Sequence, residues 1–278
     1  MTGAFQLAAI GGPWARRLAH RRGWIDDLPW TERLPDGAPE ATIDARIVWT
    51  RTAFSEYASA AAFAEIAAAL LAAGAPIDLV AAAGDFVVDE ITHTEAAARI
   101  AGALGGAVAL EVDLTRLVRP PSPGADPLLR AAELVVRTSC VGEALTVPIL
   151  KATRRMAGSA LIDAALGALI RDEAGHAQLG WWFLDWAEPA LDHAARDRLG
   201  RAAGEAIRAF APLFATARCG ASGLGALACE HYDRAFLAAL DRAVVRPLAR
   251  RGIAIPPDDL AALAPDAEPD REQRGEGA

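Results

Sequence analysis

Two short segments of the sequence place a carboxylate and an imidazole one helical turn apart. They read Asp-Glu-Ile-Thr-His at residues 89–93 and Asp-Glu-Ala-Gly-His at residues 172–176. Residues three apart on an α-helix project from the same face, so each segment aims a Glu and a His at one point. Two such pairs supply half of the helices that a site for two metal ions needs.

An unpaired glutamate lies upstream of each segment. Glu56 is separated from Asp89 by 32 residues, and Glu143 is separated from Asp172 by 28. The chain therefore repeats one layout, Glu followed by Asp-Glu-x-x-His, which indicates an internal pseudo-repeat of two helix hairpins. We expect four helices to bring together four carboxylates and two imidazoles: Glu56, Glu90, His93, Glu143, Glu173 and His176.

Each of these residues interrupts an apolar stripe of its expected helix. Around Glu143, for example, the positions on the same face are Val136, Cys140, Val147 and Leu150. A buried carboxylate costs several kcal/mol unless it is paired or bound to metal, and the stripes carry no matching Lys or Arg. The pattern favours a metal site over a structural polar network. Cys140 lies one turn before Glu143, either as a core residue or as part of the wall of the site.

Composition and charge restrict the class of protein. The chain has 278 residues, of which 53% are hydrophobic, and its net charge is −8 with a pI near 5.2. There is no dominant basic face, so we do not expect nucleic acid as a partner. Three cysteines without paired spacing fit a reducing cytoplasm, and we expect no membrane-spanning segment or secretory signal.

The periodicity predicts an all-α fold with four long helices over residues 43–73, 77–104, 127–156 and 160–186. The short link at 74–76 makes the first two an antiparallel hairpin, whereas 105–126 is a long connection. Asp126 is expected to cap the third helix with Pro127 at its first position. Pro148 lies inside that helix, where a kink either opens room for substrate or is an accident of packing.

The remaining segments flank this helical domain. Two additional C-terminal helices are expected over 189–217 and 224–250, which gives a domain of residues 43–250. Residues 1–42 form an irregular N-terminal arm that is expected to pack on the helices, because it carries three tryptophans. Residues 251–278 form an acidic, largely disordered tail, with disorder expected from Asp266 onward.

The paired layout resembles the ferritin-like di-iron carboxylate superfamily, and the Asp before each Glu resembles its oxygenase branch. That branch includes bacterial multicomponent monooxygenases, ribonucleotide reductase small subunits and the p-aminobenzoate N-oxygenase type. The resemblance covers residues 43–187 and implies a ferritin-like four-helix bundle in which the six residues above are the metal ligands, Glu90 and Glu173 bridging the metals. It also implies that Asp89 and Asp172 each accept a hydrogen bond from a ligand His. Because each Asp is adjacent to its Glu, it points off the ligand face, and we expect it to reach the imidazole of the other motif.

The sequence departs from individual members of this superfamily. The N-oxygenases carry an additional ligand His one turn before the second motif's Glu, and Leu169 occupies that position here. Ribonucleotide reductase subunits need a redox Tyr near the metals, whereas Tyr57, adjacent to Glu56, is expected to point off the metal face. The departures leave the substrate open.

The expected activity is that of a di-iron oxygenase or oxidase. Two iron ions, with manganese or a mixed Mn/Fe pair as other possibilities, would activate dioxygen to oxidise a small organic substrate. A reductase would have to donate the electrons, since the chain has no flavin or iron–sulfur motif, and a homodimer is a family-level expectation. The alternatives are a ferritin- or rubrerythrin-like protein that handles iron or manganese or scavenges peroxide, and an interaction module with vestigial ligands.

Overall fold

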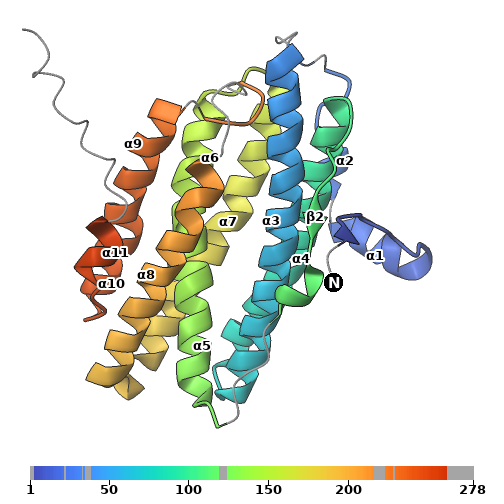
Figure 1. Ribbon diagram of the computed structural model, residues 1–278. Coiled ribbons are helices and arrows are strands. Elements are labelled where there is room, and N and C mark those ends of the chain that lie inside the picture. The colour runs from blue at the N-terminus through green and yellow to red at the C-terminus, as the bar shows by residue number, and fades with distance from the viewer. Residues whose placement is uncertain are drawn as a thin grey trace, which may run out of the picture.

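The expected all-α fold class is confirmed by the computed structural model, which is built almost entirely from helices (Figure 1). The strands among the described residues are β1 (Gly3–Ala4) and β2 (Glu111–Val112), which pair antiparallel. The structure describes residues 3–21, 23–32, 34, 39–118, 124–215, 223–227 and 229–261.

The first two long helices form the expected hairpin. They are α3 (Pro39–Ala72) and α4 (Ile77–Ala103), which pack along each other over most of their length. The turn between them contains Gly74 at a φ of 64°, a left-handed conformation that favours glycine. Helix α3 begins at Pro39, four residues before the predicted start, which shortens the N-terminal arm.

The third long helix is continuous but not uniform. It consists of α5 (Pro127–Val135), a π-helical segment η2 (Val136–Glu143) and α6 (Ala144–Arg155). The predicted cap is present, because Asp126 Oδ1 accepts a hydrogen bond from Leu129 N at 2.8 Å and Pro127 occupies the first position. The departure from α geometry lies before Glu143, whereas Pro148 sits within α6.

The fourth long helix, α7 (Ala160–Ala187), packs against α6, η2, α5 and α4. Its N-terminus is held by Ser159, whose hydroxyl accepts a hydrogen bond from Ile162 N at 3.2 Å. Glu32 of the N-terminal arm accepts a second one from Leu161 N at 2.8 Å. A carboxylate at this end also complements the helix dipole.

The C-terminal region adds helices beside this group. After a 3-10 turn η3 (Glu188–Ala190), α8 (His193–Ala215) packs on η2, and α9 (Cys229–Ala239) packs on α6. Helix α9 continues through a second π-helical segment η5 (Leu240–Val245) into α10 (Arg246–Ala249). The last long helix was predicted over residues 224–250, and in the structure it begins at Cys229, five residues after the predicted start.

The start of the predicted disordered tail is folded. Ile253 and Ile255 are buried, and α11 (Pro257–Ala261) packs on α8. Arg208 of α8 pairs with Asp259 of α11. The buried isoleucines explain why the acidic segment continues the fold this far, and the predicted disorder from Asp266 lies outside the described residues.

The N-terminal arm packs on the helices as expected, but it is less irregular than its glycines and prolines suggested. It contains α1 (Gly12–Arg21) and α2 (Gly23–Asp26), and β1 joins it to the long connection, which also holds η1 (Leu114–Arg116). Arg21 pairs with Asp85 at 3.1 Å, and Asp26 pairs with Arg99 at 2.7 Å. Both partners lie on α4, so the arm runs along that helix.

One helix, α3, contains an 18-residue window with a mean hydropathy of 1.2, which by length and composition alone could cross a membrane. A core helix of a water-soluble protein passes the same test, so a single such helix is a weak indication. Here α3 contributes buried side chains such as Trp49 and Phe63 to the core.

Candidate metal centre

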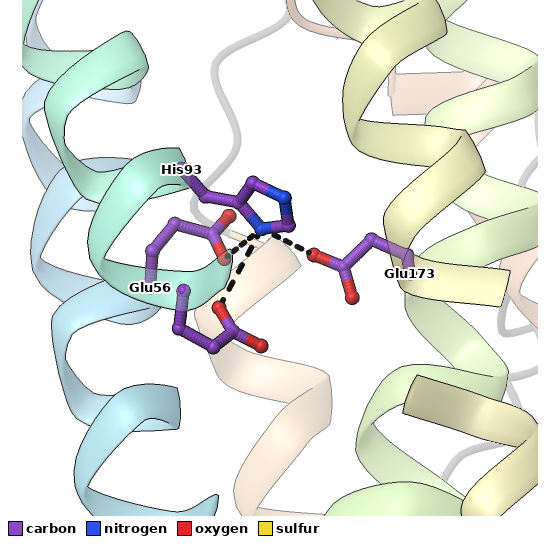
Figure 2. A group of neighbouring side chains, drawn as sticks. Glu56, His93 and Glu173 are labelled. Atoms are coloured by element: carbon purple, nitrogen blue, oxygen red, sulfur yellow. Dashed lines mark ion pairs between the residues drawn. The ribbon is translucent and has the colours of Figure 1, made fainter. Parts of the chain in front are cut away.

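The six candidate ligands come from four different helical segments and meet in the interior. Glu56 is on α3, Glu90 and His93 are on α4, Glu143 ends η2, and Glu173 and His176 are on α7. Figure 2 shows Glu56 and Glu173 pointing at the His93 ring, with dashed lines from its nitrogen to the carboxylates. The spacing in the sequence therefore translates into convergence in space.

The ligand atoms form two overlapping groups. Glu56, Glu90, His93 and Glu173 make one group, and Glu90, Glu143, Glu173 and His176 make the other. Within each group the candidate ligand atoms lie within 4.8 Å of one another. Glu90 and Glu173 belong to both groups, so these two carboxylates occupy the positions that bridging ligands would need.

The imidazoles direct the same nitrogen into the cluster. His93 Nδ1 lies 3.2 Å from Glu173 Oε1 and 3.7 Å from Glu90 Oε2. His176 Nδ1 lies 3.0 Å from Glu173 Oε2 and 3.1 Å from Glu90 Oε1. Each imidazole thus faces both shared carboxylates, one on its own helix and one on the helix opposite.

The centre is closed to solvent on nearly all sides. Glu90, His93 and His176 are fully buried, and Glu143 and Glu173 are buried too. The side chain of Glu56 is the most accessible of the six, at 14%. Both carboxylate oxygens of Glu90 and Nδ1 of His93 have no hydrogen-bond partner of acceptable geometry within the described residues. Buried polar atoms in this state are rare in native proteins and indicate a ligand such as a cation.

Two of the candidate ligands, Glu56 and Glu143, have raised pKa values. Burial, together with the nearby charges of Glu90 and Glu173, raises the pKa of Glu56 well above its usual value. Burial and the charges of the same two residues also raise the pKa of Glu143. Both carboxyl groups therefore bind a proton more readily than an exposed glutamate does.

The pKa values of the imidazoles and of Glu173 are shifted in opposite directions. Burial alone would lower the pKa of His176, but contacts with Asp89, Glu173 and Glu90 outweigh it and raise the pKa to about 12. The pKa of His93 is raised in the same sense, burial being outweighed by Asp172, Glu173 and Glu90. Burial would raise the pKa of Glu173, yet the contact with His176 and the nearby charge of His93 hold it well below its usual range.

Asp89 and Asp172 reach the imidazole of the opposite motif, which is the contact expected from the sequence. Asp172 Oδ2 lies 3.2 Å from His93 Nε2, and Asp89 Oδ2 lies 3.7 Å from His176 Nε2. In the neutral imidazole, a hydrogen bond donated by Nε2–H to the aspartate leaves the lone pair of Nδ1 toward the cluster. The two contacts are unequal, since only that of Asp172 is at hydrogen-bond distance.

Aromatic rings lie beside both imidazoles. Phe86 and Phe63 lie against His176, with ring centroids 4.3 and 5.1 Å away. Trp24 of the N-terminal arm lies edge-on to His93 at 6.4 Å. Phe86 precedes Glu90 by four residues, so the helical pattern places both on one face of α4. The position of Trp24 depends instead on how the N-terminal arm folds back.

The sequence pattern did not predict the π-helical segment that ends at Glu143. No residue type at positions 136–143 encodes it, and such segments often occur at functional sites. Helix α7 approaches this segment closely at Gly180, where a Cβ atom would lie 2.6 Å from Cys140 Sγ and 3.0 Å from Ser139 Cβ. Cys140 is fully buried in the larger apolar core, and burial raises the pKa of its thiol, so it behaves as a core residue.

Two hollows on the surface of the described residues are lined by residues other than the candidate ligands. One has a volume of about 350 Å³ and the other about 440 Å³, and both lie beside α6 and α7. Four carboxylates and two imidazoles suit transition metals such as iron or manganese, so the donor set fits a pair of these ions. Comparison of the chain with protein-family models, with curated proteins and with solved structures finds no match.

Proposed function

We propose that this protein is a non-haem di-iron oxidoreductase of the ferritin-like type, an oxygenase or oxidase that uses dioxygen on a small organic substrate. The observation that carries the proposal is the pair of overlapping ligand groups that share Glu90 and Glu173. Two ferrous ions bound there would supply the electrons that reduce dioxygen. The electron donor would be a separate reductase.

The residues of the chain would divide the work as follows. Glu90 and Glu173 would bridge, His93 and Glu56 would complete one metal site, and His176 and Glu143 the other. Asp172 would orient His93 by accepting a hydrogen bond from Nε2–H, and the deprotonated Nδ1 would then be the atom that binds metal. Phe63 and Phe86 exclude water on the His176 side.

Anaerobic loading with ferrous iron, followed by exposure to oxygen, tests the proposal. About two irons per chain and rapid oxygen consumption are expected. Replacement of Glu143 by Ala should abolish the oxygen consumption, because one metal site loses a carboxylate ligand. A protein that binds two metals without reacting with oxygen would contradict the oxidase reading, and a protein that binds no metal would contradict the site itself.

One observation favours a second candidate function. Five of the six candidate ligands are buried, and an enclosed centre suits a protein that needs no organic substrate. This candidate is a protein that handles iron or manganese, or that scavenges peroxide, with the same six ligands. Turnover of peroxide without any effect of added organic substrates would select it.

A further inference from the structure

A hollow of about 440 Å³ lies between the N-terminal arm and helices α6 and α7, which we name the arm hollow. Its volume falls within the range of roughly 300–1,000 Å³ that is typical of sites for small molecules. The apolar part of its wall consists of Trp24, Leu28, Ala164, Gly167 and Ala168, and its charged part of Asp27, Arg154, Asp163 and Arg171.

A second hollow, of about 350 Å³, extends the first along α6. Arg154 and Asp163 line both, and the second adds Lys151, Arg155 and Ile170. Lys151 is the only lysine of the sequence. Together the two hollows are lined by four cationic side chains, on a protein whose net charge is −8. A local excess of positive charge on such a surface concentrates anions.

Two aspartates, Asp27 and Asp163, line the same hollows and offset part of this positive charge. Arg154 is paired with both oxygens of Asp163, at 2.8 and 2.9 Å. Arg171, by contrast, donates to the neutral carbonyl of Gly167 at 3.0 Å and has no carboxylate within ion-pair distance among the described residues. A guanidinium has five N–H donors in a fork that matches a carboxylate or phosphate, so Arg171 retains the capacity to bind one.

The arm hollow adjoins the His93 end of the candidate metal centre without opening into it. Trp24 lines the hollow, and its ring also lies 6.4 Å from the ring of His93. Arg171 directly precedes Asp172, which contacts His93 Nε2. A molecule in the hollow would therefore contact Trp24, which lies beside His93, and Arg171, the chain neighbour of Asp172.

We propose that the arm hollow binds a small amphipathic organic anion. Its apolar part lies against Trp24 and Leu28, and its anionic head, a carboxylate or a phosphate, is held by Arg171. The site is formed by residues outside the metal centre, so binding does not depend on the proposed oxidase function and occurs in the metal-free protein as well.

Calorimetric titration of the full-length protein with hexanoate, hexyl phosphate and neutral 1-hexanol tests this proposal. Saturable binding of at least one anion, about tenfold tighter than that of hexanol, is expected because only an anion gains the charge-assisted contact. The tighter of the two anions identifies the head group. Equal affinity for hexanol, or no saturable binding of either anion, would overturn the proposal.

Three variants locate the site. Arg171→Gln should weaken binding of the preferred anion about tenfold. Gly167→Leu, which adds a side chain to the wall against the Arg154 guanidinium, should also weaken it. Arg198→Gln removes the same charge from an exposed pair with Glu133 and should leave the affinity unchanged. Anion binding that survives both substitutions in the hollow would show that the site is elsewhere.

Discussion

Glu90 and Glu173 differ from the other four candidate ligands because each belongs to both ligand groups. Replacement of Glu90 by Ala should therefore lower the metal content from about two ions per chain to nearly none. Glu56→Ala and Glu143→Ala should each retain about one ion, since each affects a single group. Metal analysis of the three purified variants measures this difference, and equal losses in all three would contradict the bridging assignment.

Asp172 and Asp89, which contact the imidazoles, should differ in how much each contributes to metal affinity. Asp172 is at hydrogen-bond distance from His93, whereas Asp89 is 3.7 Å from His176. Partners of this kind typically contribute 10- to 100-fold in metal affinity, so Asp172→Asn should weaken binding by about that factor. Asp89→Asn should weaken it less. Competition with a chromophoric chelator gives both affinities, and a larger effect at Asp89 would contradict the geometry.

Protons and metal ions compete for the cluster. The pKa values of Glu56, Glu143, His93 and His176 are all raised, so the folded metal-free protein holds protons that the unfolded chain releases. For His176, this stabilisation is complete below the unfolded value of 6.5 and is lost as the pH rises toward the folded value of about 12. Metal binding must displace the same protons, so it strengthens as the pH rises.

The expected result is that metal affinity increases from about pH 6 to about pH 9 and that loading releases protons. Over the same interval, the difference in unfolding free energy between the metal-loaded and metal-free proteins should widen. Denaturant unfolding of both forms at several pH values measures the second quantity, and a difference that is constant or shrinks would show that the cluster is not protonated as described.

At the scale of elements, the close approach of α7 to the π-helical segment η2 sets the position of Glu143 relative to Glu173. Gly180 makes this approach possible, so Gly180→Ala should overpack the interface and lower the unfolding free energy by about 1–3 kcal/mol. Gly84→Ala is the matched control, because a Cβ at Gly84 on α4 meets nothing within 4 Å. It should stabilise the protein by up to about 1 kcal/mol through helix propensity.

Chemical denaturation of the two glycine variants decides the point, since the expected changes have opposite signs. If Gly180→Ala were as stable as Gly84→Ala, the helices would not be in the contact described. If Gly180→Ala lost the metal ion at the His176 and Glu143 site but kept the ion at the His93 and Glu56 site, the interface would be shown to position Glu143.

The sequence predicted those elements whose determinants are local. Asp126 and Pro127 define a helix start by their own chemistry, and a Glu three residues before a His defines a shared face on any helix. The contact of Asp172 with the opposite imidazole followed from its adjacency to Glu173. The π-helical segment and the position of Trp24 depend on packing between segments far apart in the chain, and no local pattern carries that information.

At the scale of the whole molecule, the N-terminal arm joins parts of the fold that are distant in sequence. Glu32 binds the start of α7, Asp26 and Arg21 pair with α4, and Phe5 packs edge-on to Phe54 of α3. The helices α1 and α2 were obscured in the sequence because Gly12, Pro13 and Gly23 lie at their first positions. The arm thereby covers the α4 side of the metal centre, where Trp24 lies on His93.

This cover should control the escape of metal. Trp24→Ala opens a path to His93, so a chelator should extract metal from the loaded variant several times faster than from the unaltered protein, while the affinity at equilibrium changes less. Trp182→Ala removes an equally large side chain that is 52% exposed on α7 and should leave the rate unchanged. Stopped-flow mixing with the chelator measures both rates. Equal rates in the two variants would mean that metal leaves by another route, with the accessible edge of Glu56 on α3 as the next to examine.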